Sequence, residues 1–354
     1  MVAKEKRFRA CVAPGLRNGV AVSRQRRLLR RLGSWTHRSL TGKRIPEQEE
    51  RQARRTSEWK ERTEAGTLTP VPFIVGAERS GTTLLRLMLD AHPDLAIPPE
   101  THFIDRAAEA CEHAADPRQA FLETVTSHRR WGDFRIEGDL LTQRISAIEP
   151  FDLSEALRAF YELYAERFGK PRWGDKTPIY VHQMNLIQDL LPEAYFIHII
   201  RDGRDVALST KDLWFGPDSI EEAAQRWQSL IEKARRQSRE LPRYLEIRYE
   251  DLVSNTESTL RKICNFVDLP WDPSMLAYHK TAEERMSEIY RDIVAPRGKK
   301  VVRGEMRRSL HTLTDKPPQR DRIARWRQEM TAAERKRFEE VAGETLRELG
   351  YKVG

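Results

Sequence analysis

The stretch GAERSGTT, residues 76–83, constrains this chain most, because it follows directly on the apolar run 71–75 and leads into a helical pattern. Two glycines separated by four residues let the backbone turn tightly, so that successive N–H groups face an anion. The helix that follows adds the positive end of its dipole. Although an ordinary turn between a strand and a helix is the alternative, the combined pattern predicts a phosphate-binding loop at the carboxyl end of a strand.

The position after the second glycine holds Thr82, where a nucleotide hydrolase would carry lysine. Such a lysine reaches the terminal phosphates of a triphosphate beside Mg²⁺, so its absence argues against cleavage of ATP or GTP. The hydroxyls of Thr82 and Thr83 and the guanidinium of Arg79 offer donors to a different phosphate group. We therefore expect a lysine-free phosphate site that needs no metal.

Short apolar runs alternate with helical patterns along the rest of the chain. The expected strands cover residues 71–75, 194–200 and 244–249, and long helical patterns cover residues 152–168, 218–239 and 331–349. Strands separated by helices favour an α/β fold with a mainly parallel sheet and helices on both faces. In such a sheet, ligands bind beyond the carboxyl ends of the strands, so the polar segments that follow the three strands should converge on one crevice.

The positive charge of the chain is concentrated near its N-terminus. Residues 1–69 hold 18 Lys and Arg against 7 Asp and Glu, whereas residues 70–354 hold 44 against 47. We therefore expect a basic, partly helical or flexible extension over 1–69 and a single folded domain over 70–354. The extension could bind an anionic partner, but without interleaved aromatics or a known motif we expect no nucleic-acid binding.

The compartment is expected to be the cytoplasm. Three cysteines, Cys11, Cys111 and Cys264, cannot all pair and lack metal-ligand spacing. No apolar run reaches the roughly 18 residues that a transmembrane segment needs, and no signal peptide is evident.

The segment RSGTTLLRLMLDAHPDLAIPPET, starting at Arg79, resembles the 5′-phosphosulfate-binding segment of sulfotransferases that use 3′-phosphoadenosine 5′-phosphosulfate. It is most similar to the tyrosylprotein sulfotransferases and a related bacterial branch, over roughly residues 71–351. The resemblance implies a doubly wound α/β fold, and a donor held by the loop residues Arg79, Ser80, Gly81, Thr82 and Thr83. It also explains the missing lysine, because the donor has a single 5′-phosphate that bears the sulfuryl group.

Other segments carry further implied donor contacts. In HIIRDGRDVALS, the resemblance implies that Arg201 and Ser209 bind the 3′-phosphate; a guanidinium can fork onto two phosphate oxygens while a hydroxyl takes a third. In IRYEDL it implies that Tyr249 contacts the adenosine. In KPPQRDRIARW it implies that Lys316 reaches the nucleotide.

Two residues are the implied catalytic groups. Lys176, in RWGDKTP, matches the lysine beside the transferring sulfuryl group, where its charge can neutralise the leaving oxygen. Glu100, in PPETHF, matches the residue that takes the acceptor's proton, and His102 is the competing candidate. We expect Glu100 and Lys176 to face opposite ends of an in-line transfer. The alternative for Glu100 is that it only caps a helix or pairs with Arg79.

The sequence favours transfer of a sulfuryl group to a hydroxyl, and leaves open whether the acceptor is a small molecule, a glycan, a lipid or a peptide. Segments 105–170 and 272–315 are expected to wall the acceptor pocket. A kinase-like phosphotransferase is the first alternative, and a non-catalytic nucleotide-binding or scaffold protein is the second. The oligomeric state has no signature in the sequence.

Overall fold

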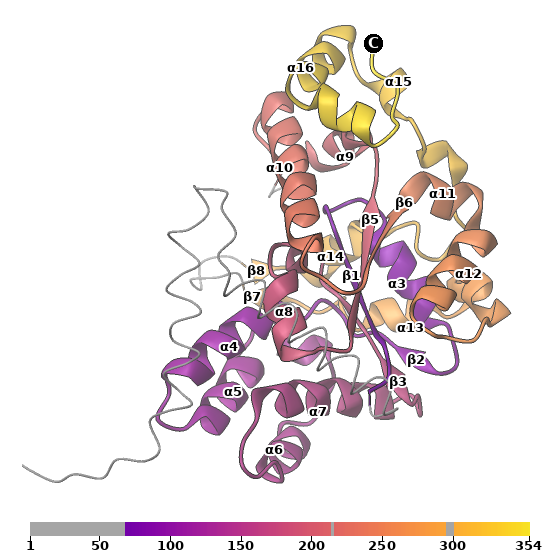
Figure 1. Cartoon of the computed structure of the whole chain (residues 1–354). Coiled ribbons are helices and arrows are strands. Elements are labelled where there is room, and N and C mark those ends of the chain that lie inside the picture. The colour runs from indigo at the N-terminus through magenta and orange to yellow at the C-terminus, as the bar shows by residue number, and fades with distance from the viewer. Residues whose placement is uncertain (1–67, 214–215, 295–300) are drawn as a thin grey trace, which may run out of the picture. The chain divides into compact units, whose positions relative to one another are not determined.

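The computed structural model describes residues 68–213, 216–294 and 301–354. A four-stranded parallel sheet, in the order β4-β1-β5-β6, forms its centre (Figure 1). The strands are β1 (Val71–Gly76), β4 (Asp175–Lys176), β5 (Ala194–Ile200) and β6 (Tyr244–Arg248). The three strands predicted from apolar runs are β1, β5 and β6, so these predictions are confirmed. β4 is too short to produce a recognisable pattern.

The two central strands are apolar because both of their faces are covered. β1 pairs with β5 from Val71 opposite Ala194 to Gly76 opposite Ile199, and every residue of both strands is buried. Side chains alternate across the sheet, so Phe73 packs into one apolar cluster and Ile74 into another.

Helices cover each face of the sheet (Figure 1). The cluster that contains Phe73 includes residues of α4 (Ile104–His113), α5 (Pro117–Thr126), α6 (Gly138–Ser146), α7 (Leu153–Glu166) and α8 (Met184–Leu190). The cluster that contains Ile74 includes residues of α3 (Thr82–Asp90), α11 (Tyr249–Ser254), α12 (Thr256–Phe266), the 3₁₀ segment η3 (Pro273–Lys280) and α13 (Ala282–Ser287). The predicted α/β fold, with helices on both faces of a parallel sheet, is therefore confirmed.

A third apolar cluster lies beyond the carboxyl end of β5. It joins α9 (Gly203–Thr210), α10 (Ile220–Ser238), α15 (Trp326–Glu329) and α16 (Ala332–Glu348). α16 starts with a capping box, in which the Thr331 side chain accepts from the Glu334 N–H and Glu334 accepts from the Thr331 N–H. The long patterns predicted over 152–168, 218–239 and 331–349 correspond to α7, α10 and α16.

Shorter elements connect these layers. They are the parallel pair β2 (Leu95–Ala96) and β3 (Arg172–Trp173), the antiparallel pair β7 (Ile293–Val294) and β8 (Val301–Val302), α14 (Gly304–Ser309), and the 3₁₀ segments η1 (Trp131–Asp133), η2 (Pro178–His182) and η4 (Arg320–Arg322). The basic extension predicted over 1–69 lies almost entirely outside the described residues, and so does Cys11. Within the part of the chain that the structure describes, no helix combines the length and the apolar character needed to cross a membrane.

Candidate active site

The glycine loop joins β1 to α3, and its two glycines are required by close backbone approach. Gly76 has a φ of 149°, and a Cβ there would lie 2.5 Å from the carbonyl oxygen of Ile199. Gly81, the N-cap of α3, has a φ of 97°, and a Cβ there would lie 2.5 Å from the ring of Tyr249. Any larger side chain would therefore strain the backbone and clash with β5 or with Tyr249.

The polar groups of this loop have the chemistry of an anion site. Ser80 is wholly buried, and its hydroxyl has no hydrogen-bond partner among the described residues. A buried polar atom without a partner is costly, and an oxyanion would satisfy it. Thr82 opens α3, and the hydroxyl of Thr83 accepts from the Lys176 ammonium at 3.4 Å. The loop therefore fits a phosphate-type group.

The polar segments after the strands converge on one cavity of about 730 Å³ at the carboxyl edge of the sheet. Its lining includes nine of the residues proposed from the sequence: Arg79, Gly81, Thr82, Thr83, Glu100, Lys176, Arg201, Ser209 and Tyr249. The competing base His102 also lines it. Ser80 lies within the loop but is not part of the lining.

One side of the cavity is formed by Arg201, which follows the end of β5. Its guanidinium lies 4.5 Å from the centre of the Tyr249 ring and donates to the carbonyl oxygens of Arg79 at 3.0 Å and Arg322 at 2.6 Å. Ser209 is carried by α9 and lines the same cavity. Two N–H groups of Arg201 are therefore already directed toward the glycine loop and the segment around η4.

The other side carries the two predicted catalytic groups in direct contact. The Lys176 ammonium on β4 lies 2.7 Å from Glu100 Oε1. The prediction that the two face opposite ends of a transfer therefore differs from the structure. Both groups are shielded from solvent, where opposite charges attract strongly and pair. The alternative that Glu100 pairs with Arg79 is not what the structure shows either.

Glu100 is held as a carboxylate by three neighbours. Besides Lys176, the Arg130 guanidinium lies 3.2 Å from Oε2 and His102 Nε2 lies 2.8 Å from the same oxygen. Burial alone would raise the pKa of Glu100, but Lys176, Arg130 and His102 together hold this pKa well below its usual range. Glu100 is thus ionised and ready to accept a proton, although its cationic neighbours weaken it as a base.

His102 contacts Glu100. Burial lowers the pKa of His102, despite the opposing effect of Glu100. A neutral imidazole next to a carboxylate donates through Nε2–H, which leaves Nδ1 as its acceptor nitrogen. His102 adopts a left-handed φ of 55°, which places its ring against the carboxylate. The geometry thus gives His102 an orienting contact with Glu100.

A hydrogen-bond network fixes the segments that carry this pair. Thr101, next to Glu100, donates through its hydroxyl to Asp175 Oδ2 at 2.8 Å, and its backbone N–H donates to the Thr177 hydroxyl at 2.9 Å. Asp175 and Thr177 flank Lys176 on both sides. The hydroxyl of Tyr161 also donates to Asp175 Oδ2, at 2.9 Å. Both backbone segments are thereby locked to each other directly beneath the Glu100–Lys176 contact.

Burial raises the pKa of Asp175 to about 6, against the hydrogen bonds from Thr101, Tyr161 and Thr177 and the charge of Lys176. Asp175 is wholly buried, and its Oδ1 has no hydrogen-bond partner among the described residues. Burial thus raises the pKa of Asp175, whereas neighbouring cations lower the pKa of Glu100, although both carboxyl groups belong to the same pair of joined segments.

Comparison with known proteins agrees with this geometry. Residues 70–273 match the family described as "Sulfotransferase family". The chain belongs to the sulfotransferase family. It is 32% identical over 220 residues to a protein-tyrosine sulfotransferase of Drosophila melanogaster, covering 60% of this chain and 40% of the relative. It is 28% identical over 220 residues to protein-tyrosine sulfotransferase 1 of Homo sapiens, covering 60% of this chain and 54% of the relative.

The matched region covers 54% of the human relative and 40% of the Drosophila relative. This sulfotransferase family member therefore spans about half the length of the curated relatives, or less. Among solved structures, it is similar to the sulfotransferase domain from the Synechococcus PCC 7002 olefin synthase, with a TM-score of 0.53 and 23% identity over 81% of this chain and 96% of that one. That likeness supports the fold.

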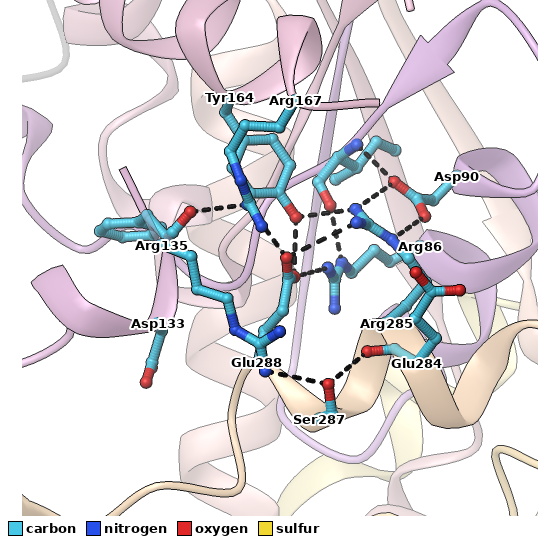
Figure 2. A network of polar contacts seen from close by, with 12 residues as sticks. Arg86, Asp90, Asp133, Arg135, Tyr164, Arg167, Glu284, Arg285, Ser287 and Glu288 are labelled. Atoms are coloured by element: carbon cyan, nitrogen blue, oxygen red, sulfur yellow. Dashed lines mark hydrogen bonds and ion pairs between the residues drawn. The ribbon is translucent and has the colours of Figure 1, made fainter. Parts of the chain in front are cut away.

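A buried polar network adjoins the cavity through Arg86, and Figure 2 shows its members. Arg86 of α3 lines the cavity and pairs with Glu288 at 3.4 Å. Glu288 also accepts from the Tyr164 hydroxyl of α7 at 2.7 Å, while Arg285 of α13 forms two hydrogen bonds with Asp90 at the end of α3. The network therefore joins the helix of the glycine loop to α7 and to α13.

Several cavity residues were not identified from the sequence, among them Arg130, His311 and Arg322. Arg130 and His311 lie in segments without a recognisable motif, although HRRW, residues 128–131, shows an unusual local concentration of positive charge. Burial, with the charges of Lys176 and Arg79, lowers the pKa of His311 to about 3, so His311 is neutral. Arg322 lies in the KPPQRDRIARW segment, six residues after Lys316. Lys316 itself is exposed and is not among the lining residues, and its carbonyl accepts from the Tyr278 hydroxyl at 2.6 Å.

Among the described residues, no group of three or more His, Cys, Asp or Glu has an arrangement that could hold a metal ion. Cys111 and Cys264, the two described cysteines, are buried and unpaired, and burial raises the pKa of each to about 11. Neither thiol lines the cavity.

Proposed function

We propose that this protein transfers a sulfuryl group from 3′-phosphoadenosine 5′-phosphosulfate to a hydroxyl group of an acceptor. The observation that carries the proposal is a lysine-free glycine loop that shares one cavity with the Glu100–Lys176 pair. The loop offers backbone N–H groups and the hydroxyls of Thr82 and Thr83 to the 5′-phosphosulfate. Ser80 is proposed to take part as a member of the same loop, although it lies behind the lining.

Arg201 and Ser209 are proposed to bind the 3′-phosphate, and Tyr249 to contact the nucleoside. Support comes from their common position in the cavity and from the Arg201 guanidinium over the Tyr249 ring. Charge-assisted hydrogen bonds from a guanidinium to phosphate are among the strongest that proteins make.

In the proposed reaction, the acceptor oxygen attacks sulfur while the bond between sulfur and the phosphate oxygen breaks. The acceptor proton passes to Glu100, and the electron pair of the broken bond stays on the phosphate oxygen. Lys176 stabilises the charge on that oxygen, for which it must turn from Glu100 toward the glycine loop. Its 3.4 Å contact with the Thr83 hydroxyl lies in that direction. Once Lys176 has turned away, Glu100 loses its strongest cationic neighbour and becomes a stronger base.

The acceptor is proposed to be a phenolic or aliphatic hydroxyl of a peptide or a small molecule. The names of the relatives in Drosophila melanogaster and Homo sapiens, both protein-tyrosine sulfotransferases, support testing peptide tyrosine first. The acceptor pocket is proposed to be walled by α4, the turn after α5 and α13–α14, because residues of all these segments line the cavity. A cytoplasmic location stays a proposal, consistent with two unpaired buried cysteines.

The decisive experiment is calorimetric titration of the protein with adenosine 3′,5′-bisphosphate and, separately, with ATP and Mg²⁺. Tight binding of the bisphosphate and weak binding of ATP are expected. The reverse order would favour a phosphotransferase. Transfer of labelled sulfate from the donor to a panel of tyrosine peptides, phenols and alcohols then tests catalysis, and it should persist in EDTA. Bisphosphate binding without transfer to any acceptor would favour a non-catalytic nucleotide-binding protein.

A further inference from the structure

Three guanidinium groups line the same side of the cavity, from three separate segments. Arg79 lies in the glycine loop, Arg201 follows β5, and Arg322 ends η4. The Nε atom of each is buried and has no hydrogen-bond partner among the described residues. After burial, the charges of Arg201 and Arg322 are the largest causes that lower the pKa of Arg79, which places all three charges within electrostatic reach.

Among the described residues no carboxylate forms an ion pair with Arg79 or Arg322, although Glu78 in the same cavity lining acts on Arg79 electrostatically. Arg79 donates to the carbonyl oxygen of Leu310 at 2.8 Å, and Arg201 donates to two carbonyl oxygens. Asp205 lies 3.6 Å from Arg201, but its carboxylate also accepts from the backbone N–H groups of Ala324 and Trp326. Within the described part of the chain, the Arg322 guanidinium forms no hydrogen bond or ion pair. Clustered like charges repel, and an anion placed among them removes the penalty.

We propose that Arg322 is a third phosphate-binding arginine of the donor site, in the role that the family resemblance assigns to Lys316. This inference rests on the proposed function, and it concerns which residue of the C-terminal segment contacts the nucleotide. Lys316 is exposed and lies outside the cavity lining, whereas Arg322 lies within it. Arg322 also lies beside the residues proposed to hold the nucleotide: after burial, Arg201 and Arg322 are the charges that act most strongly on Tyr249.

The backbone around Arg322 is anchored, which limits the entropy lost when its side chain binds. The Arg322 carbonyl accepts from Arg201 at 2.6 Å, and Arg320 donates to the carbonyl of Ser254 at 2.9 Å. Two residues further on, the Ala324 N–H donates to Asp205 at 2.8 Å. A preorganised guanidinium binds phosphate more effectively than a lysine on an exposed segment.

The test is the affinity for adenosine 3′,5′-bisphosphate, measured by calorimetry, because it needs no acceptor. Arg322→Met keeps most of the apolar stem of the side chain but removes its charge, and it should weaken binding by about tenfold or more, as expected for the loss of a charged hydrogen-bonding partner. Lys316→Met should change affinity by less than about twofold, because an exposed charge outside the site is screened. Arg327→Met is the matched control, since it removes an exposed arginine close in sequence that does not line the cavity. Arg322→Lys should fall between wild type and Arg322→Met.

Thermal unfolding without ligand separates binding from folding, and Arg322→Met should melt within about 2 °C of wild type, as usual for a half-exposed substitution. Wild type that binds the bisphosphate while Arg322→Met binds equally well overturns this inference alone. So does a larger loss in Lys316→Met than in Arg322→Met. Wild type that fails to bind the bisphosphate overturns the proposed function and this inference together.

Discussion

The two sides of the cavity differ in how their charged side chains are neutralised. On the transfer side, Glu100 is surrounded at 2.7–3.2 Å by Lys176, His102 and Arg130. On the donor side, Arg79 and Arg201 donate to backbone carbonyls, and Asp205 is a more distant carboxylate beside Arg201. The Arg322 guanidinium has no hydrogen-bond or ion-pair partner among the described residues. The charge of Glu100 on the transfer side is neutralised by cations of the protein, whereas the charge of the arginines on the donor side needs an external anion to neutralise it.

The two sides of the cavity should therefore respond differently to a ligand. Phosphates on the donor side relieve repulsion that already exists there, so the arginines there contribute chiefly to affinity. On the transfer side, a ligand must compete with the Glu100–Lys176 contact, so these residues contribute chiefly to rate. Substitutions on the two sides should therefore separate binding from turnover.

The largest effect is expected for Glu100→Gln. The amide keeps the shape of Glu100 and one acceptor oxygen but cannot take a proton, so turnover should fall by about 10²–10⁴-fold. Sulfate transfer to the best acceptor of the panel measures this, and affinity for adenosine 3′,5′-bisphosphate should stay the same. The matched variant is His102→Ala, which removes only an orienting contact and should cost less. Near-normal turnover in Glu100→Gln, with a loss in His102→Ala, would assign the base to His102.

The next largest effect is expected for Lys176→Met. Turnover should fall by about 10²–10³-fold, the usual result of removing one preorganised charge that stabilises a transition state. It should also raise the pKa of Glu100, because Lys176 is the cation that lowers this pKa most. The acidic limb of the kcat/KM profile, where Glu100 becomes protonated, should therefore move to higher pH than in wild type. An unshifted limb would show that Lys176 does not control the basicity of Glu100.

The carboxyl-edge loops of the fold could be predicted from the sequence for a physical reason. Buried parallel strands are apolar along their whole length, so 71–75 and 194–200 stand out, and the edge where they end follows from their direction. The edge strand within 244–249 instead alternates apolar and polar residues. The two glycines of the loop, Gly76 and Gly81, predict the tight backbone turn. The roles of Glu100 and Lys176 came from the family resemblance, since a two-residue strand such as β4 has no periodicity of its own.

The segment after α13 could not be predicted in this way. Its sequence over 316–326 contains one lysine and three arginines but no apolar repeat, so nothing in it indicates which side chain turns inward. The direction is fixed by contacts distant in sequence, such as the Arg201 guanidinium on the Arg322 carbonyl and Asp205 on the Ala324 and Trp326 N–H groups. The same reason explains the contact between Glu100 and Lys176, which are 76 residues apart.

On the donor side, Arg201→Ala should lower nucleotide affinity. Losing hydrogen bonds to a charged phosphate, at about 1.5–3 kcal/mol, should weaken binding of adenosine 3′,5′-bisphosphate by roughly tenfold to over a hundredfold. Binding of adenosine 5′-monophosphate should change much less, and calorimetry with both nucleotides measures the difference. Ser209→Ala should give a smaller loss in the same direction. Equal losses for the two nucleotides would mean that Arg201 does not recognise the 3′-phosphate.

The smallest effect concerns Asp175, which differs from Glu100 because burial, rather than pairing with a cation, dominates its pKa. The folded protein holds the Asp175 proton with a pKa of about 6, whereas an unfolded aspartate titrates near about 4. The stability contributed by this proton is therefore present in full below pH ~4 and is lost as the pH rises through about 6. Between pH 5 and pH 7 this loss amounts to about 1 kcal/mol of unfolding free energy.

Urea unfolding of wild type and Asp175→Asn at both pH values tests this prediction. Asparagine does not titrate, so the stability of wild type relative to the variant should fall by about 1 kcal/mol from pH 5 to pH 7. Glu100→Gln is the matched control. The pKa of Glu100 is lowered, so its contribution is lost only as the pH falls below about 4.5, and its difference from wild type should stay constant over the same range. Parallel curves for wild type and Asp175→Asn would show that Asp175 is ionised throughout, held by the hydroxyls of Thr101 and Tyr161 as firmly as Glu100 is by its cations.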